Sequence, residues 1–404
     1  MLVVDQLSLM RELSIKTESK IVMLVLDGLG GLPHPDTGKT ELETAYTPNL
    51  DTLAQGSVCG MTDPVMPGIT PGSAPGHLSL FGYNPLDYTI GRGVLEALGI
   101  DFDLRDGDVA ARGNLCTIDQ NGIITDRRAG RITTDKSASL AELLNGMQIG
   151  GVEILVEPVK DHRLVIVFRG EGLSDSVTDS DPQHVGLSPS LIKPRIENAD
   201  RMAYIANKFI EKATELLAGK YPANGLLLRG FSHKSKLHGF KEIYKLDACA
   251  IASYPMYRGL ARVVGMTVVK TGLTIVDEIT SLKNNYDRYD YFFLHYKPTD
   301  TAGEDGDFAH KVKMLEYFDQ VLPQLTALRP EVLLVTGDHS TPSSLSGHSW
   351  HPVPAMISGR FCRPDAVVAF NETACLSGGL GRLPAYHLMP LAMANAMKLE
   401  KYGA

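Results

Sequence analysis

Four short segments of the chain carry residue types that can do metal or acid–base chemistry. In chain order these residues are Asp27, Ser73, the pair Asp300 and Glu304, and the group Asp338, His339 and His348. Carboxylates and imidazoles together are ligands that suit manganese or zinc. A serine beside such an ion can act as a nucleophile, because the ion lowers the pKa of its hydroxyl. The four segments therefore favour a divalent-metal site, beside which Ser73 is a candidate nucleophile.

Each segment taken alone also allows an ordinary structural role. Asp27 could cap the segment that follows it, and Ser73 could be the N-cap of a helix. The acidic stretch 300–307 could be a solvated loop that caps the next helix. A single histidine in such a segment is usually structural, but five of the 12 histidines fall between His295 and His351. This clustering favours a metal site.

Apolar runs indicate which elements position these residues. Ile21–Leu26 is a short continuous run stopped by Asp27-Gly28, as in a strand buried on both faces of a parallel sheet. Similar runs recur at Gly225–Leu228, Ala248–Ala252, Met266–Val269, Tyr291–His295, Glu331–Val335 and Val353–Ile357. Helix-length segments lie between several of them, at Ile275–Lys283 and Phe308–Leu325, and Thr47-Pro48 opens another helix. We therefore expect a doubly wound α/β sheet that binds ligands beyond its strand ends.

The stretch from about Asp103 to Tyr221 has a different pattern. Val109–Ile118 and Ile123–Asp126 flank the Asn121-Gly122 turn, which predicts an antiparallel hairpin. Further strands are expected at Val152–Val156 and Arg163–Phe168, and a helix at Asp200–Leu217. The sequence thus predicts an α+β domain, 103–221, inserted between two parts of a core domain, 1–102 and 222–404.

Composition narrows the class of protein. The 404 residues carry 39 Lys and Arg against 47 Asp and Glu, a net charge of −8. A mildly acidic chain is a poor match for nucleic acid or an anionic membrane. Five scattered cysteines indicate reduced thiols rather than a disulfide framework. With neither a signal-peptide pattern in 1–19 nor an apolar run of about 18 residues, we expect a cytoplasmic protein.

In this order, each beside an expected strand end, the four segments closely resemble the alkaline phosphatase superfamily. Within it they resemble the archaeal type of cofactor-independent phosphoglycerate mutase. The resemblance runs from about Ile21 to Met397. It includes Ser73–Tyr83, Gly91–Gly93 with Glu96–Gly99, Gly107–Ala110, Asp126–Arg131, Asp179–Pro182 and Gly378–Arg382.

The resemblance implies two divalent ions, manganese or zinc with cobalt or magnesium as alternatives, and no 2,3-bisphosphoglycerate. One ion would be held by Asp27, Ser73, Asp338 and His339, and the other by Asp300, Glu304 and His348. Glu304 departs from the family, which shows His four residues after the Asp. Glu can still ligate, but its charge would weaken the ion as a Lewis acid. His310 is a weak substitute, and His351 matches the family less well than His348.

The resemblance also implies that Ser73 takes the phosphoryl group of 3-phosphoglycerate and returns it to form 2-phosphoglycerate, a step of glycolysis and gluconeogenesis. The inserted domain would act as a lid that excludes water. Candidate substrate-binding residues are Arg92, Arg127, Arg128, Arg131, Arg229 and Lys297. A metal-dependent phosphomonoesterase or other phosphotransferase on the same scaffold remains an alternative, as does a metal-binding protein without activity. The partner is a small phosphorylated molecule, and the sequence leaves the oligomeric state open.

Overall fold

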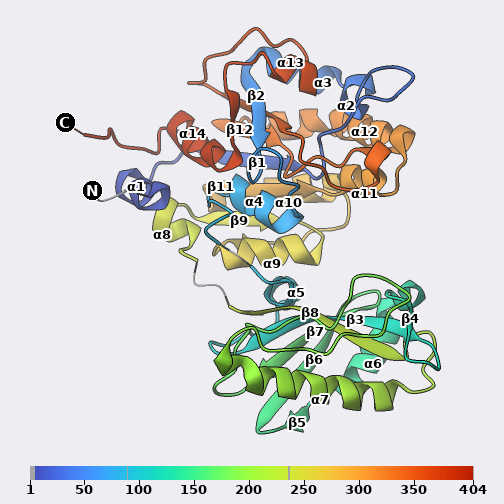
Figure 1. Ribbon diagram of the computed structural model, residues 1–404. Coiled ribbons are helices and arrows are strands. Elements are labelled where there is room, and N and C mark those ends of the chain that lie inside the picture. The colour runs from blue at the N-terminus through green and yellow to red at the C-terminus, as the bar shows by residue number, and fades with distance from the viewer. Residues whose placement is uncertain (1–4, 89, 235–236, 404) are drawn as a thin grey trace. The chain divides into compact units, whose positions relative to one another are not determined.

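The computed structural model describes residues 5–88, 90–234 and 237–403, and its contacts divide the chain into two units (Figure 1). Unit 1 comprises Met1–Thr89 and Leu237–Ala404, and unit 2 comprises Ile90–Lys236. Unit 2 begins before the predicted insertion and ends after it. Two elements account for the difference, because α5 (Arg92–Gly99) and β8 (Gly225–His233) both pack on β3 (Val109–Ile118) of unit 2.

Unit 1 is built on a mixed sheet with the strand order β10-β9-β11-β1-β12-β13-β2-β14. Its strands are β1 (Ile21–Leu26), β2 (Ser57–Asp63), β9 (Ala248–Ile251), β10 (Thr267–Val268), β11 (Tyr291–Tyr296), β12 (Val332–Thr336), β13 (Val353–Gly359) and β14 (Gly381–Pro384). Every residue of β1 is buried, as its continuous apolar run predicted. β13 runs antiparallel to both neighbours, whereas the other neighbouring strands pair in parallel. The predicted α/β fold is confirmed.

Helices cover both faces of this sheet (Figure 1). They are α1 (Gln6–Leu13), α2 (Glu41–Thr44), α3 (Pro48–Gln55), α4 (Ser73–Leu80), α8 (Phe240–Tyr244), α9 (Pro255–Val263), α10 (Ile275–Asn285), α11 (Pro298–Glu304), α12 (Phe308–Thr326), α13 (Glu372–Cys375) and α14 (Leu388–Asn395). Phe292 joins the apolar cluster that contains Phe318 of α12. The next residue, Phe293, packs edge-to-face on Phe81 after α4, with ring centroids 5.0 Å apart. Successive strand residues point to opposite faces, so the two helix layers lie on opposite sides.

Strand direction brings distant parts of the sequence to one edge of the sheet. β1 lies between β11 and β12 with Leu26 opposite Tyr296 and Val25 opposite Thr336, so the three carboxyl ends are neighbours. Because β13 is antiparallel, its amino end reaches the same edge. The segments after β1, β11 and β12 and the segment before β13 therefore converge there.

Unit 2 is an antiparallel sheet with helices packed on it. Its strands are β3, β4 (Ile124–Asp126), β5 (Met147–Ile149), β6 (Val152–Lys160), β7 (Arg163–Arg169) and β8, and its helices are α5, α6 (Thr134–Leu144) and α7 (Asp200–Leu217). The predicted placement of Gly225–Leu228 among the strands of the core sheet is wrong, because β8 pairs antiparallel with β3. α5 approaches β3 closely at a glycine. A Cβ on Gly93 would lie 2.2 Å from the backbone of Ala110.

In the described part of the chain, each helix is too short or too polar to cross a bilayer. Residues 1–4, which belong to the stretch 1–19 without a signal-peptide pattern, lie outside the described residues.

Candidate metal centre and active site

Asp27 follows β1 directly and is fully buried. Its Oδ2 accepts hydrogen bonds from the Tyr257 hydroxyl, from Nε2 of His295 at 2.9 Å and from Nζ of Lys297 at 3.0 Å. Its Oδ1 has no hydrogen-bond partner among the described residues and faces Nε2 of His339 at 3.4 Å. Burial alone would raise the pKa of Asp27, but the charge of Lys297 and the hydrogen bond from His295 hold it well below its usual range. Asp27 is therefore an ionised carboxylate whose Oδ1 is available to a ligand. The described donors to its Oδ2 are side chains, whereas an aspartate that caps the next segment would accept from backbone N–H groups.

Asp338 and His339 lie just after β12, and both are fully buried. Oδ1 of Asp338 accepts a hydrogen bond from the backbone N–H of Gly28 at 3.2 Å, which ties the loops after β12 and β1 together. Oδ2 lies 3.0 Å from Nδ1 of His77 and 3.2 Å from Nε2 of His339. Burial would lower the pKa of His77, but the charge of Asp338 raises it. Two imidazoles thus face one carboxylate oxygen.

Ser73 is the first residue of α4, and Gly72 occupies the N-cap position. Ser73 therefore does not occupy the N-cap position, and its Oγ lies 3.4 Å from Nε2 of His339. α4 comes close to the loop after β12, since a Cβ on Gly76 would lie 2.3 Å from the backbone oxygen of Asp338. A glycine at this position therefore lets the helix place the Ser73 hydroxyl beside the buried carboxylates.

Asp300 and Glu304 are one turn apart on α11, so both side chains lie on the same side of the helix. Nε2 of His348 is 3.7 Å from Oδ1 of Asp300 and 3.7 Å from Oε1 of Glu304. Nδ1 of His348 lies 2.9 Å from the carbonyl oxygen of Pro71, which can only accept, so Nδ1 carries the proton and Nε2 faces the carboxylates. Asp307, from the same acidic stretch, caps α12 by accepting from the backbone N–H of His310.

Lys297, predicted to bind substrate, lies between two of the candidate ligands. Its Nζ is 3.0 Å from Oδ2 of Asp27, 2.5 Å from Oδ2 of Asp300 and 3.1 Å from the Tyr257 hydroxyl. Burial would lower the pKa of Lys297, but the charge of Asp27 keeps it well above its usual value. The ammonium of Lys297 thus contacts Oδ2 of both aspartates, while their Oδ1 atoms face the histidines.

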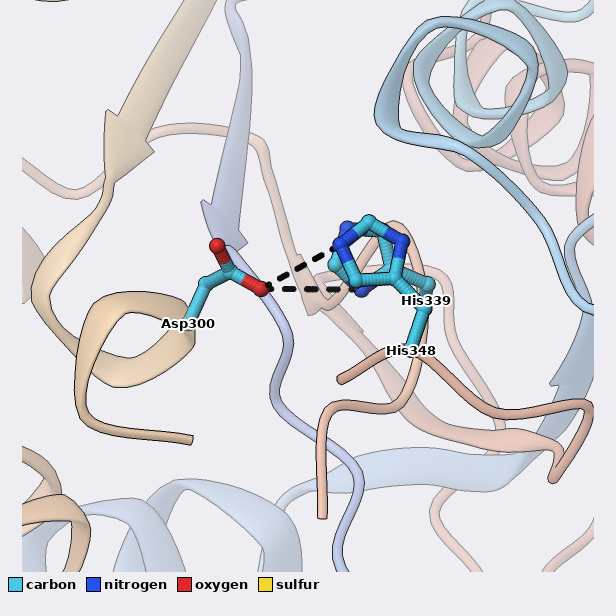
Figure 2. A group of neighbouring side chains, drawn as sticks. All are labelled: Asp300, His339 and His348. Carbon is cyan, nitrogen blue, oxygen red and sulfur yellow. Dashed lines mark ion pairs between the residues drawn. The ribbon is translucent and has the colours of Figure 1, made fainter. Parts of the chain in front are cut away.

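The candidate ligands form two overlapping groups, Asp27 with Asp338 and His339, and Asp300 with His339 and His348. Within each group the ligand atoms lie within 4.8 Å of one another. Figure 2 shows the second group, in which the rings of His339 and His348 stack with centroids 3.6 Å apart. Oδ1 of Asp27 is buried and has no hydrogen-bond partner among the described residues, so it is free to bind an ion. Mixed carboxylate and imidazole donors also fit divalent ions. Neither group includes His310, which is exposed, or His351.

Several buried side chains at the site were missed by sequence reasoning. Lys311 of α12 is fully buried and donates to the carbonyl oxygens of Gly28 at 2.9 Å, Gly30 at 3.0 Å and Thr341 at 2.8 Å. A lysine within a helix ordinarily faces solvent, so its sequence position gave no signal. The sequence position of Tyr257 on α9 likewise gave no indication of its contact with Asp27. His77 could have been found, because it lies four residues after Ser73 and so on the same side of the helix.

Among the arginines of unit 2, Arg127 and Arg229 face the buried carboxylate of Asp181. Arg127 donates from Nε at 2.9 Å and from Nη2 at 2.6 Å, and Nη1 of Arg229 lies 3.8 Å away. Arg92, at the start of α5, keeps an exposed surface. The surrounding protein and the charges of Arg229 and Arg112 lower its pKa to about 10. Arg127 is thus committed to an internal ion pair.

Arg128 and Arg131 are exposed, and their side chains have no ion pair among the residues that the structure describes. The loop that carries them is fixed by Asp126, whose two oxygens accept the backbone N–H groups of Arg128 at 2.7 Å and Gly130 at 2.6 Å. A fixed backbone with two open guanidinium groups can bind an anion with phosphate and carboxylate groups.

Comparisons with known proteins identify the family of the chain. The family model described as 2,3-bisphosphoglycerate-independent phosphoglycerate mutase matches residues 54–224. A protein of Thermotoga neapolitana named a probable enzyme of this kind is 50% identical over 402 residues, covering 99% of this chain and 100% of its own. One of Aquifex aeolicus with the same name is 51% identical over 405 residues, covering 97% and 99%. The solved structure of a cofactor-independent phosphoglycerate mutase from Thermoplasma acidophilum is 30% identical with a TM-score of 0.70, covering 94% and 100%. The chain therefore belongs to the family of 2,3-bisphosphoglycerate-independent phosphoglycerate mutases.

Proposed function

We propose that this protein interconverts 3-phosphoglycerate and 2-phosphoglycerate through a phosphoserine at Ser73, without 2,3-bisphosphoglycerate. The carrying observation is the position of the Ser73 hydroxyl, 3.4 Å from Nε2 of His339 within a buried group of carboxylates and imidazoles. The names of the full-length relatives support the same reaction. The substrate is accordingly a small phosphorylated acid, as in glycolysis and gluconeogenesis.

The residues that would hold two divalent ions are Asp27, Ser73, Asp338 and His339 for one, and Asp300, Glu304 and His348 for the other. Manganese or zinc suits this donor set best, and cobalt or magnesium are alternatives. When bound, such ions lower the pKa of a hydroxyl ligand and neutralise charge on phosphoryl oxygens. The partly buried ammonium of Lys297 adds a positive charge between Asp27 and Asp300, which offsets part of the extra negative charge that Glu304 brings.

The reaction needs no further reactant. The Ser73 oxygen forms a bond to phosphorus while the bond from phosphorus to the 3-oxygen of the substrate breaks, and the serine proton ends on that 3-oxygen. The 2-hydroxyl of the glycerate then attacks the phosphoserine, and its proton returns to Ser73. Water must be kept away from the phosphoserine, because hydrolysis would release free phosphate. We propose that Arg128 and Arg131 bind the phosphate and carboxylate of the substrate, with Arg92 and Arg229 as further candidates.

The test is an enolase-coupled assay on 3-phosphoglycerate without bisphosphoglycerate, with manganese, zinc, cobalt and magnesium in turn and free phosphate measured in parallel. We expect metal-dependent 2-phosphoglycerate that is lost in Ser73→Ala. Ser79→Ala is a matched control, since this buried hydroxyl on the same helix has no hydrogen-bond partner among the described residues. Release of phosphate without isomer would instead identify a phosphomonoesterase, and full activity in Ser73→Ala would refute the phosphoserine.

A further inference from the structure

His339 belongs to both candidate ligand groups, yet a neutral imidazole offers one lone pair. Its Nδ1 and Nε2 face in different directions. Nδ1 is 4.0 Å from Oδ1 of Asp300, whereas Nε2 lies 3.4 Å from Oδ1 of Asp27 and 3.2 Å from Oδ2 of Asp338. Whichever nitrogen carries the proton decides which group His339 can serve.

The hydroxyl of Thr341 lies between the two groups. Its Oγ1 is 2.7 Å from Oδ1 of Asp300 and 2.9 Å from Nδ1 of His339. A threonine hydroxyl has one proton, and an ionised carboxylate can only accept. The carboxylate of Asp300 is paired with the ammonium of Lys297, and its Oδ1 accepts the hydroxyl proton of Thr341. Oγ1 must then accept from Nδ1–H of His339, which leaves the lone pair on Nε2.

Thr341 is held rigidly in this position. It is fully buried, its backbone N–H donates to the oxygen of Gly30 at 3.0 Å, and its backbone oxygen accepts from Lys311 at 2.8 Å. Glycines flank it: a Cβ on Gly28 would lie 2.5 Å from Oγ1, and a Cβ on Gly303 would lie 2.3 Å from its backbone oxygen. The hydroxyl therefore has little room to turn away from Asp300 and His339.

We infer that Thr341 is a positioning residue that commits His339, through Nε2, to the group of Asp27 and Asp338 and removes it from the group of Asp300 and His348. The second group then takes Glu304 as its third ligand, whose Oε1 already lies 3.7 Å from His348. One hydroxyl thereby joins the two groups, because it orients a ligand of the first and hydrogen-bonds a ligand of the second. This inference rests on the proposed metal centre.

The test compares Thr341→Val, which keeps the shape but loses the hydroxyl, with Thr341→Ser, which keeps the hydroxyl. Thr62→Val is the matched control, because this buried threonine bonds to the backbone oxygen of Val353 at 3.3 Å, within the sheet. Titration with Mn²⁺ alone should show that Thr341→Val binds the ion of the Asp27–Asp338 group about 10- to 100-fold more weakly than wild type. Losses of this size are found when a metal ligand loses its supporting hydrogen bond. Thr341→Ser and Thr62→Val should bind close to wild type.

A second measurement does not depend on a folded variant. In wild-type protein with ¹⁵N-labelled histidines, NMR of the metal-free form should show Nδ1 of His339 protonated, and loading with ¹¹³Cd²⁺ should couple the metal to Nε2. Coupling to Nδ1, or wild-type affinity in Thr341→Val, would overturn the inference while leaving the metal centre intact. Failure of the wild-type protein to bind Mn²⁺ or ¹¹³Cd²⁺ would overturn the proposed centre and the inference together.

Discussion

Lys311→Met tests how strongly unit 1 depends on a buried ammonium behind the candidate metal centre. In the native chain this group donates to three backbone carbonyls at 2.8–3.0 Å, two in the loop after β1 and one in the loop after β12. Methionine has a similar length but no donor. Each of the three carbonyl oxygens would therefore lose a hydrogen bond from a charged group.

The magnitude follows from two opposing terms. A hydrogen bond to a charged group contributes about 1.5–3 kcal/mol, so three bonds amount to about 4.5–9 kcal/mol. Against this stands the desolvation of the ammonium, which lowers the pKa of Lys311 even though Glu41 and Glu372 raise it. Each buried carbonyl left without a donor costs about 1–3 kcal/mol, and the desolvation that is relieved offsets part of the sum, so we expect a net loss of about 3–5 kcal/mol. For domains of about 150–250 residues this lowers the melting temperature by about 6–20 °C.

The assay is urea and calorimetric unfolding of the metal-free protein, so that metal binding does not contribute. Lys313→Met is the matched control, because this lysine lies two residues away on the same helix and is exposed. Its free energy of unfolding should stay within about 0.5 kcal/mol of wild type. A loss below about 1 kcal/mol in Lys311→Met, well under the expected range, would refute the reasoning that the three carbonyls depend on the ammonium.

Three further predictions follow from single contacts. Gly76→Ala puts a methyl 2.3 Å from the backbone oxygen of Asp338, so α4 must move and carry Ser73 with it. This shift should lower kcat about 100-fold, and unchanged turnover would contradict the close approach of α4 to the loop after β12. Burial and the charges of nearby arginines lower the pKa of His162 from 6.5 to about 4 in the folded chain. As the pH falls, His162 is therefore protonated in the unfolded chain before it is protonated in the folded chain. The free energy of unfolding should accordingly decrease between pH 6.5 and pH 4. Urea unfolding at pH 7 and pH 4.5 should show that His162→Gln removes about 2–3 kcal/mol of that fall, and parallel pH profiles would argue against it. Arg127→Met should destabilise unit 2 by about 3–5 kcal/mol by unpairing a buried carboxylate. Arg128→Met should leave the free energy of unfolding within about 0.5 kcal/mol of wild type and raise KM for phosphoglycerate. Equal losses of stability in Arg127→Met and Arg128→Met would contradict the difference between an ion-paired and an exposed arginine.

Much of the fold was predictable because local patterns determine single elements. The bounds of β1, β3 and α7 agree with the predicted Ile21–Leu26, Val109–Ile118 and Asp200–Leu217. The sheet that a strand joins is a long-range property, and Gly225–Leu228 has the same apolar character whether it pairs in a core sheet or with β3. The bounds of unit 2 differ from the predicted insertion 103–221 for the same reason, since α5 and β8 belong to unit 2 through contacts that no local pattern records.

The candidate site was predictable where chemistry lies next to a strand end. Asp27, Asp300 and Asp338 were singled out on that basis, whereas His348 was preferred to His351 through the resemblance to the mutase family. That resemblance is confirmed by the relatives. The roles of these residues as ligands stay predictions. Lys311 and Thr341 could not be found, because their importance depends on which backbone and side-chain atoms surround them in the folded core, and sequence spacing does not contain that information.

The strand order of unit 1 has a consequence for synthesis on the ribosome. β1 pairs with β11 and β12, and β2 pairs with β13 and β14, so neither strand before residue 89 has a pairing partner before residue 237. Unit 2 is continuous in sequence, and its strands pair among themselves as soon as residue 233 has emerged. Domains fold as units during translation, N-terminal parts first. In this chain we expect the reverse order, because β1 and β2 lack their strand partners until after the inserted unit has been synthesised. An exposed β1 in the nascent chain is therefore a natural target for chaperones.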